Sequence, residues 1–139
     1  MAHAEITWIG GNRYVAADST MHSVVVSSPG DIGMKPPELL LVSLGTCAAF
    51  DVVKIVEKQR VKLERLSVEV SGEQATEAPW AYTSIHLRFK ATAANLGQNQ
   101  LEKAIDLSMN RYCSVRATLS PDVKVTFDAE IQSPGPSDG

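Results

Sequence analysis

The sequence predicts an α+β fold, in which runs of antiparallel strands alternate with helices. Segments with apolar residues at every second position, the pattern of strands, occur as a group of three, a group of two and a final single segment. An almost fully apolar segment, residues 36–59, predicts a long helix between the first two groups, and residues 98–112 contain a second helix. The resulting order, βββ–α–ββ–α–β, is typical of α+β proteins and not of a doubly wound parallel sheet.

The first forty residues predict a three-stranded sheet followed by a loop. Residues 3–9 alternate between apolar and polar, the sequence GGN marks a turn, and residues 13–18 form the return strand of a hairpin. Residues 22–28 are rich in β-branched side chains and add a third strand. The sequence PGDIGMKPP then excludes regular structure up to the central helix.

The central helix is expected to begin at Pro36 or Pro37, because proline is tolerated in a first helical turn. Glu38 in that turn complements the positive end of the helix dipole. The helix is apolar nearly all round for its first four turns, which places it inside a protein or an oligomer. One small sheet cannot cover it on every side, so a partner subunit is expected.

The second half of the chain predicts a long hairpin, two helical segments and a last strand. Residues 63–75 and 80–93 alternate and pair around a short loop, and residues 113–119 form another helical turn or two. Residues 123–131 are the final strand. The chain of 139 residues fits one domain, expected over residues 1–132, with a disordered tail at residues 133–139.

Composition excludes several classes of partner and several kinds of site. A net charge of −3 without a basic stripe gives no reason to expect nucleic acid. The longest apolar run, residues 39–50, is shorter than the roughly 20 residues of a membrane span, and no signal peptide is recognisable, so a cytoplasmic protein is expected. The three histidines are scattered over strands without metal-ligand spacing, and no phosphate-binding loop or serine hydrolase motif occurs. We therefore expect no metal and no organic cofactor.

The two cysteines carry the strongest chemical hypothesis. Cys47 lies in the apolar run of the central helix, and Cys113 lies at the head of a later short helix. In one interpretation Cys47 is merely a small buried apolar residue, because free cysteine is among the most buried residue types. However, Gly45 costs a helix about 1 kcal/mol relative to alanine, which suggests a close approach or a local irregularity there. Cys113, at a helix N-terminus beside Arg111, is placed to have a lowered pKa.

Two motifs resemble those of the OsmC/Ohr family, the osmotically inducible protein C and organic hydroperoxide resistance proteins. They are P-x-E-L-L-L-x-x-L-G-x-C at residues 36–47 and Y-C-S-V at residues 112–115, and the likeness covers nearly the whole chain. The resemblance implies an OsmC-like fold with antiparallel sheets wrapped around central helices in an intertwined homodimer. It also implies that each site forms at the subunit interface.

The resemblance further implies roles for four residues. Cys47 would attack a hydroperoxide, Cys113 would resolve the product as a disulfide, and a dithiol reductant would restore both thiols. Arg13, after the first turn, matches the family's arginine from the N-terminal hairpin. Glu38 is the counterpart of its helix glutamate.

One departure from the family pattern weakens the role of Glu38. The family's glutamate stands ten residues before the cysteine, where this chain has Pro37, and Glu38 stands nine before Cys47. At about 100° per residue, nine steps lead to the opposite face of a regular helix. Glu38 could therefore serve only the helix dipole, and Asp51 and Arg116 are alternative charges near the thiols.

The sequence thus predicts a thiol-dependent peroxidase that reduces organic hydroperoxides. The alternative is a non-catalytic dimer that binds a small apolar ligand and carries redox-sensitive cysteines. A purely structural dimer with inert thiols is a third interpretation. Thiol loss on exposure to hydroperoxide separates the first from the other two.

Overall fold

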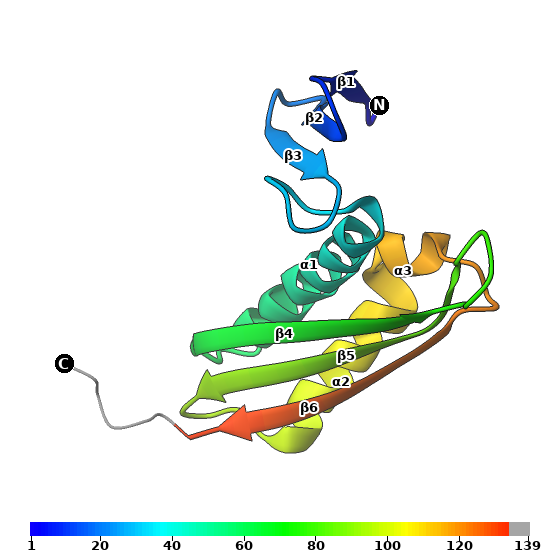
Figure 1. Cartoon of the computed structure of the whole chain (residues 1–139). Coiled ribbons are helices and arrows are strands. Elements are labelled where there is room, and N and C mark those ends of the chain that lie inside the picture. The colour runs from blue at the N-terminus through cyan, green and yellow to red at the C-terminus, as the bar shows by residue number, and fades with distance from the viewer. Residues whose placement is uncertain (134–139) are drawn as a thin grey trace. The chain divides into compact units, whose positions relative to one another are not determined.

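The computed structural model describes residues 1–133, and the predicted C-terminal tail lies outside this range except for its first residue. Figure 1 shows the order of the elements. They are β1 (Ala4–Trp8), β2 (Arg13–Asp18), β3 (Ser23–Ser27), α1 (Pro36–Lys58), β4 (Leu63–Gln74), β5 (Tyr82–Ala93), α2 (Gln98–Leu107), the π-helix η1 (Ser108–Tyr112), α3 (Ser114–Thr118) and β6 (Lys124–Gln132). Sequence periodicity predicted every element except η1.

The chain divides into two compact units, Met1–Leu40 and Leu41–Gly139. The first unit is an antiparallel sheet in the order β1-β2-β3. Its β1–β2 turn uses Gly10 and Gly11 at positive φ, a conformation that favours glycine. Ser27 is the only buried residue among residues 1–40, while Trp8 is 64% exposed. This sheet has no hydrophobic core of its own.

The second unit contains a sheet in the order β4-β5-β6. β4 and β5 pair antiparallel, as the hairpin pattern predicts. β6 pairs with β5 in parallel, so the prediction of purely antiparallel sheets is wrong for this strand. The reason is the connection: α2, η1 and α3 lie between β5 and β6, and a long helical crossover returns the chain to the same end of the sheet.

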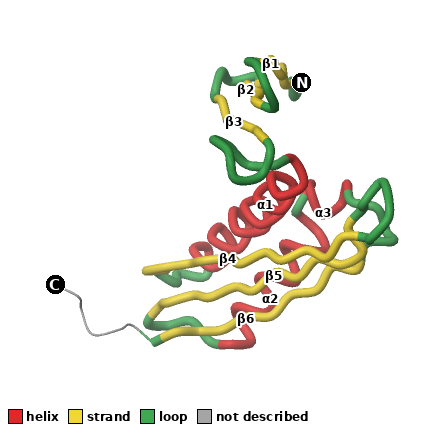
Figure 2. The backbone as a smooth tube through the Cα atoms, viewed as in Figure 1, coloured by secondary structure: helices red, strands yellow, loops and turns green. Residues whose placement is uncertain are grey.

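Helices cover one face of the β4-β5-β6 sheet, as Figures 1 and 2 show. The side chains between the two layers form one apolar cluster, and the alternation in β5 supplies its centre. Gln98, at the start of α2, donates a hydrogen bond of 2.8 Å to the carbonyl of Ala129 in β6. The largest fully buried apolar side chains are Phe89, Leu44, Ile85, Leu87, Leu101, Ile105, Val52 and Val56.

The helix α1 packs closely against β4 because of Gly45. A Cβ at this position would lie 2.7 Å from Cγ2 of Val70, so only glycine permits the observed approach. This confirms the close contact that the glycine predicted. The opposite side of α1 is uncovered, since Val42 is 45% and Phe50 is 63% exposed. In the part of the chain that the structure describes, α1 is the one helix long and apolar enough to cross a bilayer, and its inner side contributes to the core.

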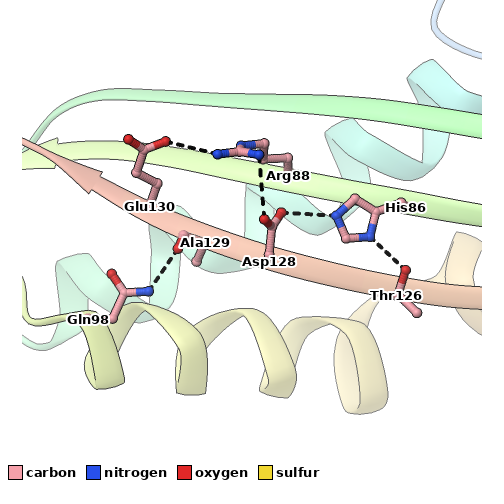
Figure 3. Close-up of polar contacts among 7 residues, drawn as sticks. All are labelled: His86, Arg88, Gln98, Thr126, Asp128, Ala129 and Glu130. Atoms are coloured by element: carbon pink, nitrogen blue, oxygen red, sulfur yellow. Dashed lines mark hydrogen bonds and ion pairs between the residues drawn. The ribbon is translucent and has the colours of Figure 1, made fainter.

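A polar network lies on the other face of this sheet, across β5 and β6 (Figure 3). The ring of His86 contacts Thr126 Oγ1 at 2.7 Å and Asp128 Oδ1 at 3.0 Å. Arg88 lies 3.8 Å from Asp128 and 3.4 Å from Glu130. These ionic side chains are about half exposed, so the network stabilises the parallel pairing only modestly. We interpret it as a solvated surface of the sheet.

Candidate functional site

The second unit brings the two cysteines together. Cys47 lies on α1, and Cys113 is the residue before α3. The two thiols lie close enough for each to shift the pKa of the other, although they are 66 positions apart in sequence. Both are free thiols; Cys47 is partly exposed, whereas Cys113 is only 2% exposed. Two thiols in contact form a site where a disulfide can close, which distinguishes them from isolated core residues.

The π-helix η1 determines where Cys113 lies. Its wider turn ends with the N–H of Cys113 donating to the carbonyl of Ser108 at 2.8 Å. The buried Ser108 hydroxyl donates to the carbonyl of Ala48 at 3.0 Å and lies 3.3 Å from the Asp51 carboxylate. Short π-helical turns are rare and occur often at functional sites. Here the turn joins the segment before Cys113 to the part of α1 that follows Cys47.

The environment of Cys47 favours its thiolate. Partial burial raises the pKa of this thiol, but hydrogen-bond donors outweigh that effect, and the net pKa lies below the ordinary value for cysteine. The donors are the backbone N–H of Val115, the Cys113 thiol, and the hydroxyl and backbone N–H of Ser114. A thiolate is the reactive form of cysteine, so Cys47 is the more nucleophilic thiol of the pair.

The environment of Cys113 has the opposite effect. Burial raises its pKa to about 11, and the neighbouring Cys47 adds to the rise, although the backbone N–H of Arg116 opposes it. This N–H lies 3.4 Å from the Cys113 sulfur. The expectation of a lowered pKa at Cys113 is therefore wrong. The N–H groups in the first turn of α3 lower the pKa of both thiols, but they outweigh burial only at Cys47.

The structure also assigns positions to the alternative charged residues. The Asp51 carboxylate contacts Ser108, and Arg116 reaches Cys113 through its backbone N–H. Ser114, which the sequence did not single out, has its hydroxyl 3.9 Å from the Cys47 sulfur. Only its place after a cysteine at a helix start could have drawn attention to it.

Arg13 and Glu38, the other two candidate residues, belong to the first unit. Arg13 forms a two-point ion pair with Asp31, with Nε donating to Oδ2 at 2.9 Å and Nη2 to Oδ1 at 2.8 Å. This pairing raises the pKa of Arg13 and lowers that of Asp31. Glu38 lies in the first turn of α1, exposed, and its carboxylate makes no ion pair with residues 1–133. The carboxylate that holds Arg13 is thus Asp31, which no sequence motif indicated.

The second unit contains two hollows near its helices, and one of them includes a cysteine of the pair in its lining. One, of about 180 Å³, is lined by Cys113, Arg111, Arg116, Met109, Asn110 and Ala117. The other is a groove of about 410 Å³ between α1 and the α2–η1 segment, lined by Asp51, Lys54, Ile55, Lys58, Gln59, Leu107 and Tyr112. Within residues 1–133 no group of three or more His, Cys, Asp or Glu side chains could hold a metal ion.

Known proteins share this arrangement of strands and helices. Residues 28–128 match the family model for OsmC-like proteins. The chain is 32% identical to Protein YhfA of Escherichia coli (strain K12) over 129 residues, which are 92% of this chain and 96% of that protein. A hypothetical protein from Aquifex aeolicus VF5 has a crystal structure with a TM-score of 0.87 and 25% identity, covering 96% of this chain and 98% of that one.

A more distant likeness is confined to the fold. The organic hydroperoxide resistance protein OhrB of Bacillus subtilis has a TM-score of 0.64 at 13% identity, covering 94% of this chain and 98% of its own. The predicted α+β class is confirmed by these structures, and the two cysteine motifs indicated the correct family. The chain belongs to the OsmC-like protein family.

Proposed function

We propose that this protein is a thiol-dependent peroxidase that reduces organic hydroperoxides, with Cys47 as nucleophile and Cys113 as resolving thiol. The observation that carries the proposal is a pair of contacting thiols whose pKa values shift in opposite directions. A lowered pKa suits the thiol that attacks peroxide. A raised pKa keeps the second thiol protonated and unreactive until the first has been oxidised.

The proposed reaction has two steps on the protein. The Cys47 thiolate attacks the terminal oxygen of ROOH, the O–O bond breaks, and ROH leaves after taking up a proton, which gives a sulfenic acid on Cys47. Cys113 then attacks that sulfur; its proton and the sulfenic hydroxyl leave as water, and a disulfide forms. A dithiol supplies the two electrons that restore both thiols.

The catalytic roles of Arg13 and Glu38 remain predictions in this scheme. The groups that lower the pKa of Cys47 all belong to the second unit, and they are hydrogen-bond donors without a full positive charge. An arginine contribution would add to an ionisation that the start of α3 already favours. Asp31, as the partner of Arg13, would then take over the role of the helix glutamate in orienting the guanidinium.

We also propose that the protein works as a cytoplasmic homodimer. The support is apolar surface that a single chain leaves uncovered: Val42 and Phe50 on α1, and Ile6 and Trp8 on the first sheet, which lacks a core. A second copy of the chain is the proposed occupant. The proposed cycle starts from two reduced thiols, which a reducing compartment such as the cytoplasm maintains.

The proposal is tested by mixing reduced protein with cumene hydroperoxide or hydrogen peroxide and counting free thiols with time. We expect both thiols to disappear, faster with cumene hydroperoxide, and a disulfide between Cys47 and Cys113 to be found by mass spectrometry. Cys47→Ser should abolish consumption, and Cys113→Ser should allow one round followed by over-oxidation of Cys47. Thiol loss no faster than in the urea-unfolded protein would refute the proposal.

A non-catalytic ligand-binding dimer is the second candidate. It is favoured by the groove of about 410 Å³, where the apolar side chains of Ile55, Leu107 and Tyr112 lie beside two lysines. Such a lining suits a small apolar molecule with an anionic end. This function is preferred if thiol loss is slow while a fatty acid protects the folded protein against thermal unfolding.

A further inference from the structure

The small hollow of about 180 Å³ adjoins one cysteine of the pair and not the other. Cys113 contributes to its wall, whereas Cys47 does not. Thiol–disulfide exchange requires the attacking sulfur to approach along the line of the bond that breaks. A thiol bound in this hollow would lie next to Cys113 and not next to Cys47, so Cys113 is the sulfur within its reach and Cys47 is the leaving group.

The lining of the hollow is positively charged. Arg111 and Arg116 are its two ionisable side chains apart from the thiol, and no acidic residue contributes to it. Neither guanidinium forms an ion pair with any residue in the described range 1–133. Arg111 instead lies over the ring of Tyr112, with 5.7 Å to the ring centre. Two unpaired guanidinium groups beside a buried sulfur form a site suited to an anion.

We propose that this hollow is the docking site of the reductant, a dithiol compound with a carboxylate or similar anionic group that Arg111 and Arg116 bind. Its thiolate attacks the Cys113 sulfur of the oxidised protein. This inference rests on the proposed function, because it concerns the disulfide that the peroxidase cycle forms. Beyond the proposed function, the inference specifies which sulfur the reductant attacks and which charge the reductant carries.

The proposed step conserves atoms and electrons. The reductant thiolate forms an S–S bond to Cys113, the bond between Cys113 and Cys47 breaks, and its electron pair leaves with Cys47 as a thiolate. The second thiol of the reductant then attacks the reductant's first sulfur and releases Cys113, which takes a proton. The reductant becomes a disulfide and has supplied two electrons.

The different acidities of the two thiols also favour attack on Cys113 with release of Cys47. The thiol with the lower pKa is the better leaving group in exchange, and burial and the neighbouring thiol raise the pKa of Cys113 to about 11. The pKa of Cys47 is lowered instead. Expulsion of Cys47 is thus the easier cleavage, and it returns the nucleophile in its reactive form.

The experiment uses full-length protein oxidised with diamide, so it does not depend on peroxide. Rates of disulfide reduction are measured with 3-mercaptopropionate, 2-mercaptoethanol and cysteamine, which are anionic, neutral and cationic, and are normalised to thiolate concentration. We expect the anionic thiol to react about tenfold faster than the neutral one at low salt, and the cationic thiol to react more slowly than both. The combined variant Arg111→Gln/Arg116→Gln should lose this preference and keep the rate with 2-mercaptoethanol. The exposed Arg65→Gln is the matched control.

A second measurement identifies the attacked sulfur. Iodoacetamide is added during reduction with 3-mercaptopropionate to capture the released thiolate, and peptides are mapped by mass spectrometry. We expect mercaptopropionate on Cys113 and the alkyl group on Cys47. The reverse pattern would overturn the inference, as would an anionic preference that 0.5 M salt leaves unchanged in the wild type. If diamide forms the disulfide and cumene hydroperoxide does not, the proposed peroxidase function fails, but the reduction of the disulfide still tests this inference. If neither oxidant forms the disulfide, the proposed function and this inference both fail.

Discussion

The opposite pKa shifts of the two thiols predict that an alkylating reagent will modify Cys47 well before Cys113. The perturbation is a timed exposure of the reduced, folded protein to iodoacetamide at pH 8. With a pKa of about 11, Cys113 is ionised to only about 0.1% at this pH. An ordinary thiol with a pKa of 9.0 is about 9% ionised at this pH, and Cys47, whose pKa lies below that value, exceeds that fraction.

The expected ratio of rates follows from two effects. For a Cys47 pKa just below 9.0, the ionised fractions differ by about 90-fold in favour of Cys47. The more basic Cys113 thiolate is intrinsically more nucleophilic, and a Brønsted slope of about 0.4–0.5 makes it about sixfold to tenfold more reactive per thiolate. The net preference for Cys47 is therefore about tenfold, and the burial of Cys113, which is 2% exposed, increases it further.

The assay is quantitative peptide mapping by mass spectrometry after quenching at several times. In denaturant the two cysteines should react at nearly equal rates, which provides the control. In Cys47→Ser, Cys113 should react faster than in the wild type, because the neighbouring thiol contributes to its raised pKa. Equal labelling in the folded protein, or faster labelling of Cys113, would show that the assignment of nucleophile and resolving thiol is wrong.

Four further measurements test the fold and the site. Gly45→Ala should lower the free energy of unfolding by about 1 kcal/mol in urea titrations at fixed protein concentration, since the new Cβ meets Cγ2 of Val70 at 2.7 Å. Adding Val70→Ala should recover part of the lost stability, and a Gly45→Ala variant more stable than the wild type would contradict the close contact. Ser108→Ala should cost about 1–2 kcal/mol in the same assay, because a buried donor is lost, and an unchanged midpoint would count against that hydrogen bond. Phe50→Glu should shift the elution volume in size-exclusion chromatography to that of a monomer, and an unshifted dimer would exclude this side of α1 from the interface. The rate of the first peroxide turnover should rise with pH through the lowered pKa of Cys47 and level off below the pH at which ordinary thiols ionise; a profile that rises only through pH 9 would contradict the shift.

Most of the secondary structure follows from local sequence. Alternating apolar residues in β5 place Ile85, Leu87 and Phe89 on the buried face, and the prolines and apolar run define α1. These features are predictable because strand and helix periods are properties of neighbouring residues. The two cysteine motifs likewise lie within short stretches and sufficed to indicate the family.

Other features depend on contacts between distant segments. The parallel pairing of β6 depends on where the crossover returns the chain. The partner of Arg13 is Asp31, 18 residues away across β3 and its loop. The π-helix that positions Cys113 is joined to α1 through Ser108 and Ala48, 60 residues apart.

The sequence by itself determined the helices and strands, the family, and the two sulfur atoms that carry the proposed chemistry. Only the tertiary structure decided which of them ionises first, and it reversed the order of acidity expected for Cys113. The physical reason is that a thiol's pKa depends on burial and on nearby hydrogen-bond donors. For Cys47 those donors are the Cys113 thiol and the first residues of α3, which the fold brings from 66 positions away and more.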